Sequence, residues 1–140
     1  MKRSLFESIR AIPYTLGSAI DRLSALSGVL GINVITADAN AVANVTITHS
    51  DTADSSFEPV LDERIFLSET RPVKNNDGAV TGYIVSAPVE AGQLLNMEID
   101  LVGCKQYIKV NVEYTAGDSA ATASAGYVIT LGDFNQTPAE

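Results

Sequence analysis

The run Thr48-His49-Ser50-Asp51 holds the three residue types of a serine-hydrolase triad side by side. In such a triad the histidine, the nucleophile and the carboxylate converge in space from separate elements. Side chains that are adjacent along a strand point to opposite faces, so adjacency is the wrong geometry for proton transfer between them. We therefore interpret His49 as the last inward-facing residue of a strand rather than as a general base.

The single cysteine, Cys104, lies between Gly103 and Lys105. A neighbouring cation can lower the pKa of a thiol and make it reactive. An unpaired cysteine is nevertheless usually a small buried hydrophobe, and a disulfide within the chain needs a second cysteine. Cys104 and His49 together would supply only two of the four ligands of a structural zinc site. The sequence therefore predicts neither an internal disulfide nor a metal centre.

The acidic residues and the glycines also lack the spacing of a known site. Asp51 and Asp54 do not follow the alternating acidic pattern of an EF-hand loop. Glu98 and Asp100 share one face of a predicted strand, and this spacing does not establish the carboxylate separation that a glycosidase needs. The glycines at 28 and 31 lack the following residues of a phosphate-binding loop. These patterns indicate a noncatalytic protein that needs no cofactor or metal.

Alternation of apolar and polar residues predicts the elements that hold these side chains. The connections are too short for helical crossovers, so we expect a mostly β protein, an antiparallel β-sandwich. A tight turn is predicted at 74–78, because Asp-Gly tolerates positive φ at low cost. We also expect 95–101 to pair with 108–114, since few residues separate them. The predicted strands span 32–36, 43–50, 64–68, 80–86, 95–101, 108–114 and 127–131.

The first thirty residues allow two interpretations. Apolar residues recur with helical spacing between Leu16 and Leu30, which favours an amphipathic helix. Glycines at 17, 28 and 31 are poor helix residues, so an extended segment is equally compatible. We divide the chain into an N-terminal arm that is helical or extended (1–30), a β-sandwich domain (31–133) and a polar C-terminal tail (134–140).

Composition limits the partners. The 140 residues carry 17 acidic and 9 basic side chains, a formal net charge of −8, and form one domain's length of chain. Nucleic acid binding relies on clustered lysine and arginine, so this balance argues against it. No run approaches the roughly 20 apolar residues that cross a bilayer, and the start lacks the uninterrupted apolar stretch of a secretory signal. We expect neither a nucleic acid nor a membrane partner.

Several segments resemble small structural proteins of tailed bacteriophages. The likeness covers less than half of the chain, in separated patches. It is carried by the strand 95–101 leading into Val-Gly-Cys-Lys-Gln-Tyr-Ile-Lys-Val at 102–110, by Val-Ile-Thr-Leu-Gly-Asp at 128–133, by Thr-Ile-Thr-His-Ser-Asp at 46–51 and by Gly-Ser-Ala-Ile-Asp at 17–21.

The family that these segments resemble is the capsid cement, or decoration, proteins, as in short-tailed phages of the Bordetella phage type. The resemblance implies a jelly-roll-like β-sandwich that binds as a homodimer to a shell of major capsid protein with the HK97-like fold. It also implies a place on the outer surface of the virion capsid after synthesis in the host bacterial cytoplasm. A cement protein is a structural, noncatalytic protein.

The first ten residues are basic and partly apolar in an otherwise acidic chain. One interpretation is an amphipathic start that packs on its own sandwich. The other is an arm that docks on another subunit, because a terminus is ordered only when it is held down and opposite charge aids docking. The second interpretation gives these candidate capsid-contact residues: Lys2, Arg3, Leu5, Phe6, Ile9 and Arg10.

Two other functions stay open from the sequence. A phage tail or receptor-binding accessory β-domain is one, with carbohydrate as its candidate ligand. Sugar-binding faces usually offer aromatic platforms, and this chain has no tryptophan and only 6% aromatic residues. A small hydrolase that combines His49 with distant carboxylates is the other, and no constellation of residues in the sequence supports it.

Overall fold

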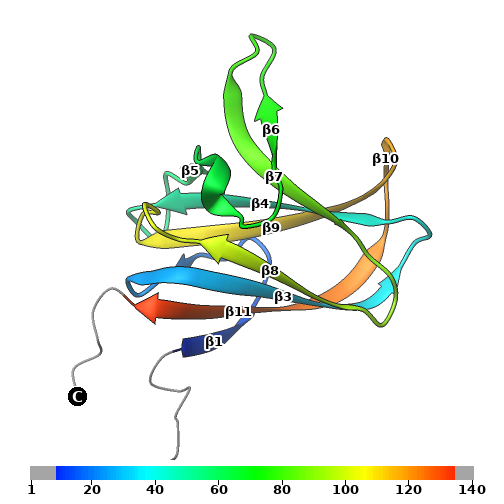
Figure 1. The fold of residues 1–140 in the computed structure, drawn as a ribbon, viewed down its shortest axis with the longest axis horizontal. Helices are drawn as coiled ribbons and strands as arrows, with labels where there is room; N and C mark the ends of the chain where they lie inside the picture. The colour runs from blue at the N-terminus through cyan, green and yellow to red at the C-terminus, as the bar shows by residue number, and fades with distance from the viewer. Residues whose placement is uncertain (1–8, 135–140) are drawn as a thin grey trace, which may run out of the picture.

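The computed structural model describes residues 9–134, which form eleven strands and one short 3₁₀ helix (Figure 1). The elements are β1 (Ile9–Tyr14), β2 (Ile20–Asp21), β3 (Ala25–Ala37), β4 (Val42–Ser50), β5 (Glu58–Pro59), η1 (Glu63–Ile65), β6 (Arg71–Lys74), β7 (Val80–Pro88), β8 (Leu94–Asp100), β9 (Tyr107–Ala116), β10 (Ser119–Ala120) and β11 (Ala123–Phe134). Within this range no helix combines the length and the apolar character needed to cross a membrane.

The strand order is that of a jelly roll. β1 pairs with β11, β2 with β9, β3 with β8 and β4 with β7, all antiparallel, so the first half of the chain pairs with the second half in reverse order. The pairs β11–β3 and β9–β4 then join these units into two sheets, with the orders β1-β11-β3-β8 and β2-β9-β4-β7. The second sheet is extended by β10 beside β9, β5 beside β4 and β6 beside β7. The eight strands of the two orders have the connections of the double Greek key of a jelly roll. The prediction of a mostly β protein with an antiparallel β-sandwich is confirmed.

The core lies between the two sheets and follows the alternation of each strand. In β4 the inward residues are Ala43, Val45 and Ile47, and in β9 they include Ile108 and Val110, all of them buried. The strand predictions at these two places are confirmed. Burial of such side chains contributes about 25 cal/mol for each Å² of apolar surface removed from water, which holds the two sheets together.

The helical interpretation of the N-terminal part is wrong. Gly17, Leu23 and Ser24 have φ values of +80°, +52° and +64°, which are turn conformations that interrupt a helix. Residues 9–30 instead supply β1, β2 and the first half of β3, so a boundary after residue 30 falls inside a strand of the sandwich. Gly28 occupies an inward position of β3, where a Cβ would lie 3.4 Å from the Thr130 carbonyl oxygen. Because this inward position holds a glycine instead of a larger apolar residue, the alternation of β3 is not visible in the sequence.

Two further predictions are corrected. Residues 64–68 are not a strand, because the Asp62 carboxylate accepts a hydrogen bond from the Arg64 N–H and starts the 3₁₀ turn η1. The consecutive residues Ile65 and Phe66 are both buried, which alternation does not allow. β8 and β9 do not pair with each other, because β8 pairs with β3 and β9 pairs with β4 in the opposite sheet. Alternation identifies the buried face of a strand but not its partner.

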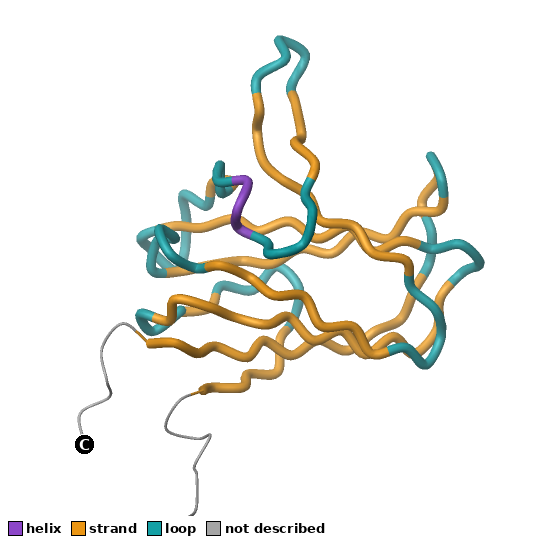
Figure 2. Tube along the Cα trace, in the orientation of Figure 1, coloured by secondary structure: helices purple, strands orange, loops and turns teal. Residues whose placement is uncertain are grey.

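The hairpin of β6 and β7 projects from the sandwich (Figure 2). Its predicted tight turn is confirmed, with Gly78 at φ +81°. The Asn75 side chain accepts hydrogen bonds from the N–H groups of Asp77 and Ala79, both at 3.0 Å, and so fixes the turn. Of the predicted tail 134–140, Phe134 ends β11 and the rest lies outside the described residues.

Candidate functional site

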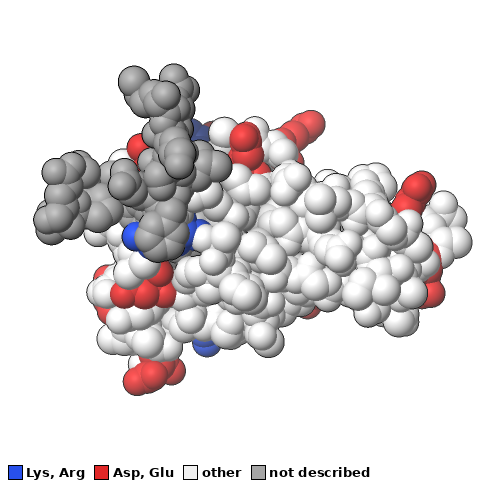
Figure 3. Space-filling model, turned by 90° about the horizontal axis from the view of Figure 1, so that it is seen from below, with Lys and Arg blue, Asp and Glu red and all other residues white. Residues whose placement is uncertain are grey.

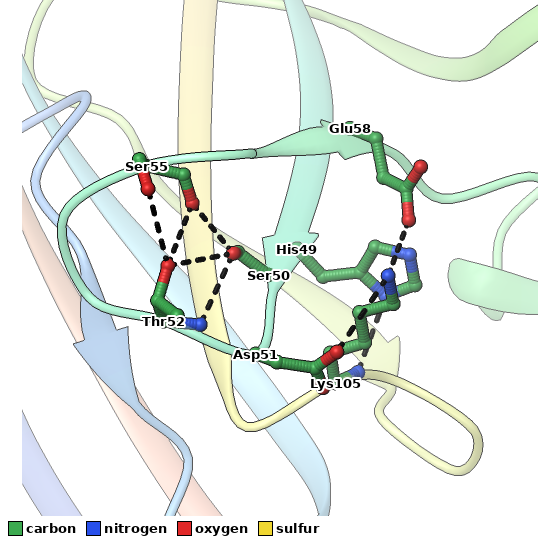
Figure 4. A network of polar contacts seen from close by, with 7 residues as sticks. All are labelled: His49, Ser50, Asp51, Thr52, Ser55, Glu58 and Lys105. Carbon is green, nitrogen blue, oxygen red and sulfur yellow. Dashed lines mark hydrogen bonds and ion pairs between the residues drawn. The ribbon is translucent and has the colours of Figure 1, made fainter.

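The end of β4 brings His49 next to the loop that joins β8 to β9. Within the sheet His49 lies opposite Glu58 of β5 and opposite Ile108 of β9. Its Nδ1 accepts a hydrogen bond of 3.2 Å from the Lys105 N–H (Figure 4). A nitrogen that accepts carries no proton, so the neutral ring holds its proton on Nε2. His49 thus ties a strand end to a loop.

Lys105 is the centre of the charged contacts around His49. Its Nζ forms an ion pair with the Glu58 carboxylate and lies 3.9 Å from the Asp51 carboxylate (Figure 4). The hydrogen bond from Lys105 holds the pKa of Glu58 below its usual value. Desolvation of the ring, followed by the charge of Lys105, lowers the pKa of His49, while Glu58 and Asp51 oppose this shift. Neutral imidazole is therefore the favoured form near pH 7.

The Ser50 hydroxyl is hydrogen-bonded to the loop that follows β4. Its buried hydroxyl donates a hydrogen bond of 2.7 Å to the Ser55 carbonyl and accepts one of 3.1 Å from the Thr52 N–H. Figure 4 shows the side chains of His49 and Ser50 on opposite sides of the strand. Among residues 9–134, no hydrogen bond joins Ser50 to His49. The three residue types of a triad are adjacent in the chain but are not aligned for proton transfer.

An open hollow of about 310 Å³ lies beside His49. Each of its three carboxylates already accepts a hydrogen bond: Glu58 from Lys105, Asp62 from Arg64 and Asp100 from the Val102 N–H. In the part of the chain that the structure describes, no group of three or more acidic, histidine or cysteine side chains is arranged to hold a metal ion. The hollow is lined by His49, Glu58, Pro59, Val60, Leu61, Asp62, Ile65, Asp100, Val102 and Gly103.

Cys104 is buried, as its sequence interpretation expects. Burial is the largest cause that raises the pKa of its thiol to about 11, and the nearby charge of Arg22 opposes the shift only in part. At neutral pH the thiol is therefore protonated, and a protonated thiol is a poor nucleophile. The adjacent Lys105 directs its ammonium group to Glu58 and Asp51 rather than to the thiol.

Two of the six candidate capsid-contact residues fall within the described range. Ile9 and Arg10 are the first residues of β1, where they lie opposite Gly132 and Leu131 of β11, and both side chains are partly exposed. Strand β1 is an edge of its sheet. The other four candidates, Lys2, Arg3, Leu5 and Phe6, lie outside the described residues.

The structure adds one residue that sequence reasoning did not assign to the site. In the sequence Lys105 is notable only as a neighbour of Cys104, whereas its main partner, Glu58, is 47 residues away in the chain. Alternation places a side chain on a face, but it does not tell which loops meet at the end of a sheet. No local signal in the sequence would have found this contact.

Comparison of the chain with protein-family models, with curated proteins and with solved structures found no match.

Proposed function

We propose that the protein is a structural, noncatalytic virion component that binds the outside of a bacteriophage capsid and cements neighbouring major capsid subunits of the HK97-like fold. The observation that supports this most is the jelly-roll strand order, an architecture that viral capsid domains use repeatedly. The resemblance of four sequence segments to phage cement proteins points the same way. In this proposal the protein acts as a homodimer on the outer surface of the virion.

A cement protein must resist the outward pressure of a packaged genome. Many copies that each contact two or more capsid subunits can do so with modest contacts, because simultaneous engagement raises avidity without new chemistry. The fold suits this load, since the first strand of the described chain, β1, pairs with the last, β11, and Tyr14 in β1 is hydrogen-bonded to β9 in the opposite sheet. Tension on β1 would therefore be shared with β11 in its own sheet and, through Tyr14, with β9 in the opposite sheet.

The proposed capsid contact begins at the edge strand β1. Ile9 and Arg10 start this strand, and the basic and apolar residues Lys2, Arg3, Leu5 and Phe6 precede it in the chain. Positive charge at this position would be attracted to acidic capsid surfaces, from which the chain's net charge of −8 would otherwise repel it. Strand β1 would set the direction in which these residues leave the sandwich.

The test is co-sedimentation of the purified protein with capsid shells that lack it, over a salt series. Saturable binding at a fixed number of copies per shell is the expected result. If the basic residues make the contact, binding weakens as salt increases. Failure to bind at any salt concentration contradicts the proposal and directs attention to the phage tail and to glycans.

The contact residues are tested by deleting residues 1–8, which leaves the whole of β1 in place. A deletion through residue 10 would remove two residues that pair with β11 and would confuse attachment with folding. Weaker shell binding with an unchanged unfolding midpoint is expected. Lys2→Glu should also weaken binding, whereas Lys74→Glu on the projecting hairpin is the matched control and should not. If the deletion variant binds shells as well as the native chain, the proposed capsid contact through the N-terminal arm is contradicted.

A further inference from the structure

Three of the four strands of one sheet, β1, β11 and β3, carry no charged residue at a set of outward positions. These outward positions are residues 9, 11 and 13 of β1, the even-numbered residues 126–132 of β11 and the odd-numbered residues 27–35 of β3. They are glycine, alanine, serine, threonine, asparagine, proline, valine and isoleucine only. Figure 3, seen from the side of β1 and β11, shows a wide uncharged area with acidic groups and a few basic ones at its margins. We call these positions the uncharged face.

The next strand of the sheet marks a limit of this face. On β8 the outward residues include Glu98 and Asp100, which lie opposite Val29 and Ser27 of β3. The boundary thus falls between β3 and β8. A sheet face that water covers normally carries charged or polar side chains in alternation with the buried ones. Three adjacent strands whose outward residues include apolar ones and no charged ones indicate a face that something covers.

We propose that a second copy of this chain covers the uncharged face, with the two sheets packed face to face about a two-fold axis. Each copy has a net charge of −8, so two copies repel unless they meet where the charges are absent. Contact here keeps the carboxylates at the rim, in water, and buries no unpaired charge. A basic partner would be recognised by carboxylates, which these positions lack. The proposal assigns a face to the proposed homodimer.

The side chains of the uncharged face can interdigitate with their own copies. Val128 lies near the middle of the uncharged face, with 42% of its surface exposed, and Gly31 of β3 lies opposite it. A Cβ at Gly126, two residues away on the same face, would have nothing within 4 Å. Packed sheets lie about 10 Å apart with the side chains of one between those of the other. Two-fold symmetry would place each Val128 against spaces that glycines leave in the partner.

The size of the face sets the strength of the dimer. Three strands about 4.8 Å apart and about 30 Å long cover roughly 400 Å² on each copy, or roughly 800 Å² in the pair. Stable interfaces commonly bury about 1,200–2,000 Å², so this one belongs at the weak end. The dimer should therefore dissociate on dilution. Its strength on a shell would come from simultaneous contacts with capsid subunits.

The experiment is sedimentation velocity over a concentration series from about 1 μM to about 1 mM, a range that brackets weak dimers. The native chain should pass from monomer to dimer within this range. Val128→Glu should remain monomeric throughout. The matched control is Val80→Glu on the projecting hairpin, since Val80 is also a strand valine and is 38% exposed. This variant should dimerise as the native chain does. Unfolding midpoints of both variants show that each is folded.

Salt provides a second, independent readout. Added salt screens the repulsion between two acidic copies, so it should strengthen a dimer whose contact face is uncharged. An interface of ion pairs would respond in the opposite way. A native chain that stays monomeric, dimerisation of Val128→Glu equal to that of the native chain, or a dimer that weakens with salt each overturns the proposal. Because this experiment contains no capsid shells, a failure to dimerise can be distinguished from a failure to bind the capsid.

Discussion

Protonation of His49 would remove the lone pair with which Nδ1 accepts the hydrogen bond from the Lys105 N–H. It would also place a positive ring beside the Lys105 ammonium, whose charge is one cause of the lowered pKa of His49. In the unfolded chain neither constraint applies, so the unfolded histidine takes up a proton at higher pH. Protonation therefore favours the unfolded chain, and the contribution of neutral His49 to stability is present above the unfolded pKa of about 6.5 and is lost below it.

We expect the free energy of unfolding to fall between pH 7.5 and pH 5.5, and to fall less in His49→Asn. The asparagine side chain retains an acceptor near the position of Nδ1 but does not titrate. Urea unfolding of both proteins at the two pH values measures the difference. An equal change of stability in the two proteins would show that His49 does not contribute in this way.

At the scale of the element, the strand β2 is so short that, in the described chain, part of β9 has no strand neighbour on the side away from β4. β2 pairs with only two residues of β9, and the backbone of Val110 lies just beyond them. The Tyr14 hydroxyl accepts a hydrogen bond of 2.8 Å from the Val110 N–H and donates one of 2.7 Å to the Ser18 carbonyl. The Gly17 N–H donates a hydrogen bond to the Val110 carbonyl. A side chain of β1 thus takes the place of a strand on the opposite sheet.

Tyr14→Phe should destabilise the protein by about 1–3 kcal/mol, because a buried backbone N–H loses its acceptor. Tyr83→Phe is the control. Among the described residues, the Tyr83 hydroxyl makes no hydrogen bond, so this change should stay within about 0.5 kcal/mol of the native chain. Urea unfolding at pH 7 compares the three proteins. If the two variants lose the same stability, the Tyr14 contact does not hold the sheets together.

The elements also show what the sequence could predict. Alternation located β4, β8 and β9, because each places apolar side chains on one face only. It did not reveal the N-terminal half of β3, where Gly28 stands at an inward position, or the turn η1, where the Asp62 carboxylate accepts a hydrogen bond from the Arg64 N–H. The contact between Lys105 and Glu58 joins a loop to strand β5, 47 residues away in the chain, which no local pattern encodes. Strand partners and the meeting points of loops depend on topology.

For the whole molecule, the jelly roll sets the order in which the sheets can be completed. β11 lies between β1 and β3, so the sheet β1-β11-β3-β8 cannot close until the last strand of the described chain is in place. In the same sheet Ile9 lies opposite Gly132, at opposite ends of the described chain. The entropy of closing such long loops must be overcome before these pairings stabilise the chain.

We therefore expect slow refolding, with a relaxation time in the millisecond-to-second range that is typical of sandwiches dominated by pairings between distant residues. Stopped-flow dilution from urea, followed by tyrosine fluorescence, measures it. Tyr14 and Tyr127 lie opposite each other on β1 and β11, so their environment reports closure of this sheet. The Val80→Glu variant is a control, because the projecting hairpin closes locally and should fold at nearly the native rate. Complete refolding within the instrument dead time would mean that the pairing of β1 with β11 does not limit the rate.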